Sequence, residues 1–236
     1  LDNMKSAVEK NDYVTAYNDV IQIYGLDINY DDYKDNILVV VEAYIEWCNQ
    51  NGLFVDAIKA IELARTYFGD DIFESLYQKI YVENEKYQLL VSKLDEYVDV
   101  MKNDQYNESR IKECIVEINK IEGIHNQVCS SSLSMKDDDD SSTELDGKGA
   151  VLSWIDGNMI LFFGTYDEGI RRGECVYTVV QSENFIDEYR GNWVNGIPDG
   201  ELEIRRSINI SDLPENTNFE EKITGYVSNG VYEGQW

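Results

Sequence analysis

Residues 189–200 read Tyr-Arg-Gly-Asn-Trp-Val-Asn-Gly-Ile-Pro-Asp-Gly, and the offsets of their aromatic and glycine residues recur in the sequence on either side. Three copies of one five-position set are present: Phe162, Gly164, Tyr166, Gly169 and Gly173, then Tyr189, Gly191, Trp193, Gly196 and Gly200, then Ile223, Gly225, Val227, Gly230 and Gly234. Recurrence at such spacing indicates a repeated supersecondary unit. The sequence therefore predicts a repeat array in the C-terminal third of the chain.

The segments between the repeat glycines have the period of β-strands. Apolar and polar residues alternate there, and the pairs Asp156-Gly157, Asn195-Gly196 and Asn229-Gly230 are typical of two-residue hairpin turns. Glycine permits the positive φ of such turns and the close approach of neighbouring hairpins. We therefore predict antiparallel hairpins over residues 147–236. The aromatic residues of the second copy are expected in a shared core, with direct ligand contact as the alternative.

The second copy has the pattern Tyr-x-Gly-x-Trp-x-x-Gly-x-x-x-Gly, which resembles that of the MORN repeat family. The resemblance implies a row of stacked β-hairpins. Tyr166 replaces the tryptophan in the first copy, and Cys175 and Leu202 stand where a further glycine is usual. The third copy has aliphatic residues at its aromatic positions. The residues assigned to the repeat, all with structural roles, are Gly164, Tyr166, Gly169, Gly173, Tyr189, Gly191, Trp193, Gly196, Gly200, Gly225, Gly230 and Gly234.

The N-terminal half has the period of amphipathic helices. Its apolar residues recur at intervals of three and four, and breaks are expected at Asn11, Gly25, Gly52 and Gly69. The clearest unit is residues 52–64, whose helical stripe consists of Phe54, Ala57, Ile61 and Ala64. A further helix is expected after the polar cap Asn107, with its apolar stripe at Ile111, Ile115, Ile118 and Ile121.

Three segments of this half can be aligned on Ala16, Ala57 and Leu90. The second interval is close to the roughly 34-residue period of tetratricopeptide repeats, and residues 52–64 match the second helix of that family. The half therefore resembles a degenerate tetratricopeptide-type solenoid, although the tryptophan signature of the first helix is missing. The resemblance implies stacked helix pairs with a concave face suited to peptides or proteins. A generic helical bundle is the alternative.

These patterns together predict an α+β protein with two segregated domains. An all-α, tetratricopeptide-like domain of helical hairpins is expected at residues 1–129 and an antiparallel β-hairpin array, MORN-like in its repeats, at residues 147–236. Residues 130–146, rich in serine and aspartate, are expected to form an acidic linker. A calcium loop at residues 137–140 is the alternative for the acidic run, although it lacks the glycine and the glutamate of an EF-hand.

Composition limits the chemistry that the chain can support. The formal net charge of −26 makes binding to nucleic acid or to an anionic membrane unfavourable, so a basic or neutral partner is expected. The cysteines lack close spacing and the single histidine is His125, so neither a metal nor a cofactor is predicted. We interpret the cysteines as buried thiols, with a bridge between Cys114 and Cys129 as the alternative, and His125 as a residue of a helix end.

Two basic pairs, Arg171-Arg172 and Arg205-Arg206, stand out in the acidic chain. A solvated surface that balances neighbouring acids is the first interpretation of these pairs. A site for a phosphate or a carboxylate is the alternative.

No nucleophile elbow, phosphate-binding loop or specific Cys–His pair is recognisable in the sequence. We therefore predict no catalytic residue and expect a non-catalytic protein–protein interaction or scaffolding module with a protein partner. The alternatives are a protein that binds lipid or a cell-surface polymer, and an enzyme that acts on such a polymer. The oligomeric state is open. An extracytoplasmic location, with an anchor upstream of Leu1, is expected, and a cytoplasmic location is the alternative.

Overall fold

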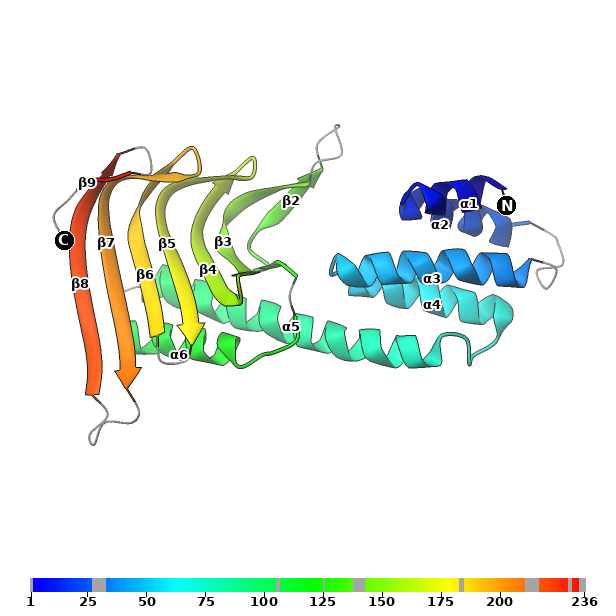
Figure 1. Cartoon of the computed structure of the whole chain (residues 1–236), viewed down its shortest axis with the longest axis horizontal. Coiled ribbons are helices and arrows are strands. Elements are labelled where there is room, and N and C mark those ends of the chain that lie inside the picture. The colour runs from blue at the N-terminus through cyan, green and yellow to red at the C-terminus, as the bar shows by residue number, and fades with distance from the viewer. Residues whose placement is uncertain are drawn as a thin grey trace. The chain divides into compact units, whose positions relative to one another are not determined.

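The protein has a helical N-terminal region followed by an antiparallel sheet (Figure 1). A computed structural model describes residues 2–26, 33–104, 107–124, 126–137, 143–182, 185–210, 217–228 and 231–233. The chain divides into two compact units, residues 1–86 and residues 87–236. The predicted order of a helical region and a sheet is therefore confirmed, and each unit is described by itself below.

The first unit consists of helices, of which α1 to α4 contact their neighbours in sequence. They are α1 (Asp2–Glu9), α2 (Tyr13–Tyr24), α3 (Lys34–Gln50), α4 (Phe54–Phe68) and the beginning of α5 (Glu74–Asn103). The predicted stripe of α4 is buried, because Phe54, Ala57, Ile61 and Ala64 all face other helices. Its small alanines allow neighbouring backbones to approach closely. The expected break at Gly69 is the C-cap of α4, with a φ of 109°.

The second unit is built on one antiparallel sheet. Its strands are β1 (Val128–Cys129), β2 (Ser134–Asp137), β3 (Thr143–Ile155), β4 (Asn158–Asp167), β5 (Ile170–Ser182), β6 (Phe185–Val194), β7 (Ile197–Ile210), β8 (Thr217–Ser228) and β9 (Val231–Glu233). The order across the sheet is β1-β3-β4-β5-β6-β7-β8-β9, and β2 pairs with β3. From β3 to β9 every strand therefore lies beside its sequence neighbour.

Two-residue turns join several of these strands. The predicted turns at Asp156-Gly157 and Asn195-Gly196 are present, and both residues of each have positive φ. A third turn, Glu168-Gly169, has the same conformation. Positive φ at both central residues gives the turn a twist that matches the strands it joins. The third predicted pair, Asn229-Gly230, lies outside the described residues.

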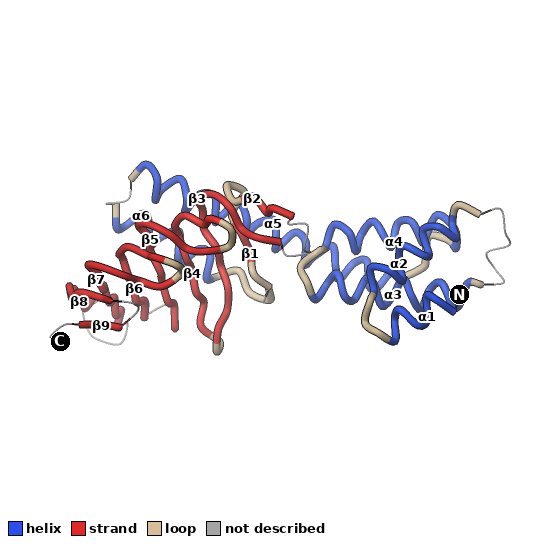
Figure 2. The backbone as a smooth tube through the Cα atoms, turned by 90° about the horizontal axis from the view of Figure 1, so that it is seen from above, coloured by secondary structure: helices blue, strands red, loops and turns tan. Residues whose placement is uncertain are grey.

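One face of the sheet is covered by helices of the same unit. The C-terminal part of α5, from Tyr87, and helix α6 (Glu108–Asn119) lie along this face in both views (Figures 1 and 2). The fully buried Tyr97 of α5 meets Phe163 of β4 edge to face, with 6.1 Å between the ring centroids. Helix α6 begins at the predicted cap Asn107 and buries Ile111, Ile115 and Ile118 of its predicted stripe, whereas Ile121 lies beyond its end at Asn119 and is only partly buried. We call this the helix face.

The opposite face has a core of its own, made by the strands and their turns. This hairpin core consists of Val151, Phe162, Tyr166, Cys175, Trp193, Leu202, Ile204 and Val227. Trp193 of β6 lies 6.1 Å from Phe162 of β4, and Tyr166 lies 5.3 Å from the same ring. Trp193 of the second copy thus packs on Phe162 of the first. No single hairpin could bury these side chains alone.

The division between the units differs from the expected boundaries at residues 129 and 147. The last described helix ends at Asn119, Val128–Cys129 is a strand, and residues 87–119 belong to the same unit as the sheet. The apolar stripes of these helices are buried in that unit, and this is the physical reason for the difference.

The acidic linker expected at residues 130–146 is wrong for its described parts, because β2 and the start of β3 pair there. Leu133 and Leu145 supply apolar side chains that pack against the hairpin core. The buried Ser130 accepts a hydrogen bond from the backbone N–H of Ala150. Residues 138–142, which include most of the acidic run considered for calcium, lie outside the described residues.

Candidate functional site

Two different structural requirements explain why glycine occupies the repeat positions. A Cβ at Gly164 would lie 2.5 Å from Cys175 Sγ, and one at Gly191 would lie 2.8 Å from the backbone oxygen of Glu201. These two glycines therefore permit close approach of the next strand. Cys175 and Leu202, which depart from the repeat pattern, are the residues that fill the space over them.

Of the other repeat glycines, Gly169 and Gly196 are turn residues, whereas Gly173 and Gly200 lie within β5 and β7, where the strand register shifts. Gly169, Gly173, Gly196 and Gly200 have φ values of 72°, 72°, 84° and 108°. L-residues with a side chain rarely adopt this region. Gly225 pairs with Leu202 in the β7–β8 ladder. Gly230 and Gly234 lie outside the described residues.

The aromatic repeat residues lie in or against the hairpin core. Tyr166 and Trp193 are buried there, and Tyr189 packs against the core with its ring 5.9 Å from that of Tyr177. Burial raises the pKa of Tyr166 to about 12, so its phenol is uncharged at neutral pH. These rings therefore stabilise the array from inside.

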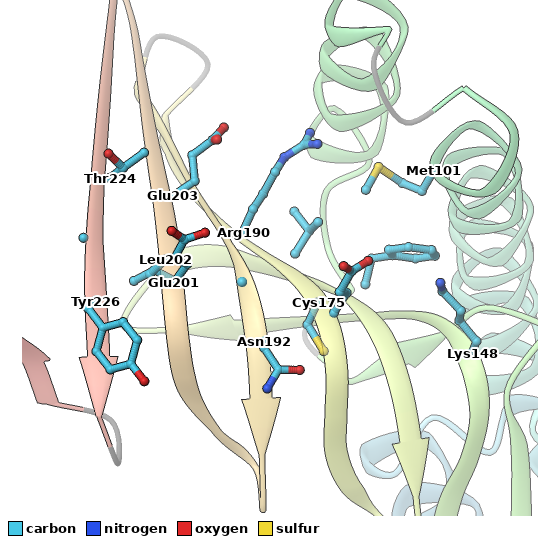
Figure 3. Close-up of a pocket in the computed structure, with 15 residues that line it drawn as sticks. Met101, Lys148, Cys175, Arg190, Asn192, Glu201, Leu202, Glu203, Thr224 and Tyr226 are labelled. Atoms are coloured by element: carbon cyan, nitrogen blue, oxygen red, sulfur yellow. The ribbon is translucent and has the colours of Figure 1, made fainter.

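A groove of about 720 Å³ crosses the strands on the helix face, beyond the end of α5 (Figure 3). We call it the cross-strand groove. Its lining comes from α5 and from β3 to β8: Met101, Lys148, Phe163, Glu174, Cys175, Val176, Arg190, Gly191, Asn192, Glu201, Leu202, Glu203, Thr224, Gly225 and Tyr226. The glycines at positions 191 and 225 leave backbone exposed in its floor.

The charges of the cross-strand groove differ in how they are paired. Arg190 contacts Glu188 at 2.5 Å, and Glu203 contacts Lys222 at 2.8 Å. Glu174 and Glu201 are exposed, and neither has an ion-pair partner among the described residues. The groove therefore offers two carboxylates to a partner.

No pattern in the sequence marks these groove residues. Glu174, Glu201 and the half-exposed Tyr226 occupy strand positions that point away from the hairpin core. The alternation of the strands is visible in the sequence, but only the register places the three residues along one groove.

The four arginines of the two basic pairs differ in the groups that they contact. Arg172 contacts Asp167 at 3.3 Å, Arg205 contacts both Glu203 and Glu108, and Arg206 contacts the buried Asp187 at 2.8 Å. For these three, the first interpretation of neighbouring acids agrees with the contacts. Arg171 is different: its guanidinium lies 4.4 Å from the centre of the Phe162 ring.

The described residues were compared with the requirements of a metal site and of a membrane-spanning helix. Within the described ranges, His, Cys, Asp and Glu side chains form no group that could hold a metal ion. The helices in the same ranges include none with the length and apolar character needed to cross a bilayer. His125 lies outside them.

The cysteines are free thiols, as predicted, and no bridge joins Cys114 to Cys129. Burial raises the pKa of Cys48 and of Cys175 to about 11. A thiol with that pKa carries about one-hundredth of the thiolate of an ordinary cysteine at pH 8. These thiols are therefore weak nucleophiles in the folded protein.

We expect iodoacetamide at pH 8 to label Cys175 at least about 100-fold more slowly in the folded chain than in denaturant. Peptide mass spectrometry over time measures both rates. The partly exposed Cys129 is the internal comparison and should react faster than Cys175 when the protein is folded. Equal rates for the two thiols in the folded chain would contradict the prediction.

Comparisons with protein-family models, with curated proteins and with solved structures give no match.

Proposed function

We propose that the protein is a non-catalytic protein-binding or scaffolding module, with a MORN-like hairpin array in its second unit and tetratricopeptide-like helices in its first. The observation that carries the proposal is the cross-strand groove, whose lining residues come from α5 and from strands β3 to β8. Repeat arrays typically bind through extended surfaces of this kind. The twofold role of the glycines, in turns and in close approach, supports the MORN-like assignment.

The partner that suits the groove is a basic, extended segment of another protein. Glu174 and Glu201 are exposed carboxylates, and the net charge of −26 attracts cations from a distance. Tyr226, which is 52% exposed, offers a ring with a hydroxyl at the edge of the groove. Tyrosine is enriched where protein interfaces concentrate their binding energy.

A direct test uses two labelled peptides of equal length and equal apolar content, one lysine-rich and one glutamate-rich. Fluorescence anisotropy at physiological salt should show at least about tenfold tighter binding of the basic peptide. The double variant Glu174→Lys/Glu201→Lys should lose about tenfold or more of that affinity. Tyr226→Ala should weaken binding by about fivefold or more, because the ring would lose its contact area.

The matched control is Glu42→Lys/Glu46→Lys, which makes the same charge change at two exposed positions of α3 in the first unit. Retained affinity in this control would place the attraction in the groove. If both double variants weaken binding equally, or if the acidic peptide binds as tightly as the basic one, the groove is not the docking surface.

A further inference from the structure

A second cavity lies on the hairpin side of the sheet, the face opposite to the cross-strand groove. It has a volume of about 410 Å³ and is lined by Gln127, Leu145, Val151, Ser153, Ile160, Phe162, Tyr166, Gly169, Ile170, Arg171, Asn195 and Gly196. We call it the Arg171 pocket. Aliphatic and aromatic side chains share its walls with three uncharged polar side chains, so polar and apolar groups line it together. A mixed lining of this kind can hold a small ligand that has both a polar and an apolar part.

Arg171 is the one charged residue in the lining of this pocket. No carboxylate of the described residues pairs with it, although the chain has 46 acidic residues and 20 basic ones. Its neighbour Arg172 pairs with Asp167. Arg171 is half-buried, with its guanidinium over the Phe162 ring and beside the Tyr166 hydroxyl, and neither uncharged group neutralises it, so an anion there would gain a charge-assisted hydrogen bond.

The array does not need this cation in order to fold. In the second copy the position equivalent to Arg171 is Pro198, two residues after the turn glycine, as Arg171 follows Gly169. Pro198 pairs with Trp193, as Arg171 pairs with Tyr166, and both turns keep the same positive φ. The fold of the hairpin tip therefore does not account for the arginine.

The two aromatic side chains beside Arg171, Tyr166 and Phe162, stay uncharged across the physiological pH range. Tyr166, which pairs with Arg171 across the strands, has a pKa raised to about 12 by burial. Its phenol remains protonated and does not repel an anion. Phe162, also in the pocket lining, lies under the guanidinium, with 4.4 Å from the guanidinium carbon to the ring centroid.

From this arrangement we propose that the Arg171 pocket binds an organic carboxylate with an apolar body, the carboxylate on Arg171 and the body against Ile160, Ile170 and Phe162. The site is separate from the cross-strand groove. A free acid and the C-terminal carboxylate of a peptide that ends in an apolar residue share this chemistry, and the experiment distinguishes them.

The test is isothermal titration calorimetry of the whole chain with phenylacetate as the probe, and with phenylacetamide and acetate as neutral and truncated comparisons. Phenylacetate should bind at least about tenfold more tightly than either. A tetrapeptide that ends in phenylalanine, measured with a free and with an amidated C-terminus, identifies the source: binding of the free form alone adds the peptide to the ligands. If only the free acid binds, the ligand is a small molecule.

Arg171→Gln should abolish the preference for phenylacetate over phenylacetamide, and Arg171→Lys should keep part of it. Arg172→Gln is the matched control and should leave the preference unchanged, since that side chain is paired and does not line the pocket. Ile170→Glu, at a position 38% exposed, leaves Arg171 in place and adds a competing carboxylate, so it should also abolish binding without affecting the fold.

Three results would overturn the proposal: equal binding of phenylacetate and phenylacetamide, an equal loss in Arg172→Gln and Arg171→Gln, or full binding in Ile170→Glu. The proposal would also be overturned if none of the acids bound at about 10 mM, because a site with so high a dissociation constant would be far weaker than typical small-ligand sites. None of these results bears on peptide binding in the cross-strand groove, because the two sites share no lining residue.

Discussion

Replacing Tyr97 with alanine is expected to lower the free energy of unfolding of the second unit by about 4 kcal/mol, the usual cost of truncating a buried aromatic ring. Tyr97 is fully buried on α5 and packs edge to face on Phe163 of the sheet. The ring lies in the part of α5 that belongs to the second unit. Its loss should therefore destabilise the sheet and leave α1 to α4 unchanged.

Hydrogen exchange followed by mass spectrometry measures both effects in one sample. Peptides from β3 to β7 should lose protection in Tyr97→Ala, whereas peptides from α2 to α4 should keep it. Tyr97→Phe keeps the ring and should behave nearly as the unchanged protein. Loss of protection confined to α1–α4 would show that the whole of α5 belongs to the helical unit, contrary to the division described above.

The second large effect is expected at Gly164. Gly164→Ala would place a methyl group 2.5 Å from Cys175 Sγ and 3.0 Å from Cε1 of Phe162. Overpacking of this kind typically costs about 2 kcal/mol, because side chains and backbone must move. Urea unfolding monitored by tryptophan fluorescence would show a lower midpoint with an unchanged slope.

A double-mutant cycle separates this clash from other effects of the substitution. Cys175→Gly removes the sulfur, so the pair Gly164→Ala/Cys175→Gly should be more stable than the sum of the single changes predicts, by about 1 kcal/mol or more. Gly157→Ala is the control, since no atom lies within 4 Å of its added Cβ and only backbone strain at a φ of 79° is expected. Coupling of Cys175→Gly to Gly157→Ala as strong as its coupling to Gly164→Ala would contradict the steric explanation.

Local signals in the sequence predict many of the helices and turns. The stripe of α4, the cap and stripe of α6 and the Asx-Gly turns depend on residues that are neighbours in the chain. For the turn at Glu168-Gly169, the only sequence signal is the repeat glycine, because glutamate is not a typical first residue of such a turn.

The partners of those elements could not be predicted in the same way. Leu90, Leu94 and Tyr97 form an apolar stripe on α5, which predicts that this helix packs against an apolar partner. The stripe does not identify that partner, which is a sheet formed by strands much later in the chain. The serine- and aspartate-rich composition of residues 130–146 favours a linker. In the structure, however, Leu133 and Leu145 pack the described ends of that stretch against the hairpin core.

The candidate sites depended on register and pairing even more strongly. Arg171 and Arg172 are indistinguishable in the sequence as members of one basic pair, and only the structure shows that one is neutralised by Asp167 and the other is not. The groove residues Glu174 and Glu201 belong to different hairpins, so no local motif joins them.

Trp193 packs on Phe162 between the first two copies, and every strand from β3 to β9 lies beside its sequence neighbour, so the array is a linear chain of nearest-neighbour couplings. The coupling between the first two copies has an aromatic pair, Phe162 with Trp193, whereas Val227 of the third copy contributes only an aliphatic side chain. In a one-dimensional cooperative system, opening begins where the coupling is weakest and spreads toward the strongest. Thermal fluctuations should therefore unzip the sheet from β8 toward β4, with a gradient of opening free energies along the repeat axis.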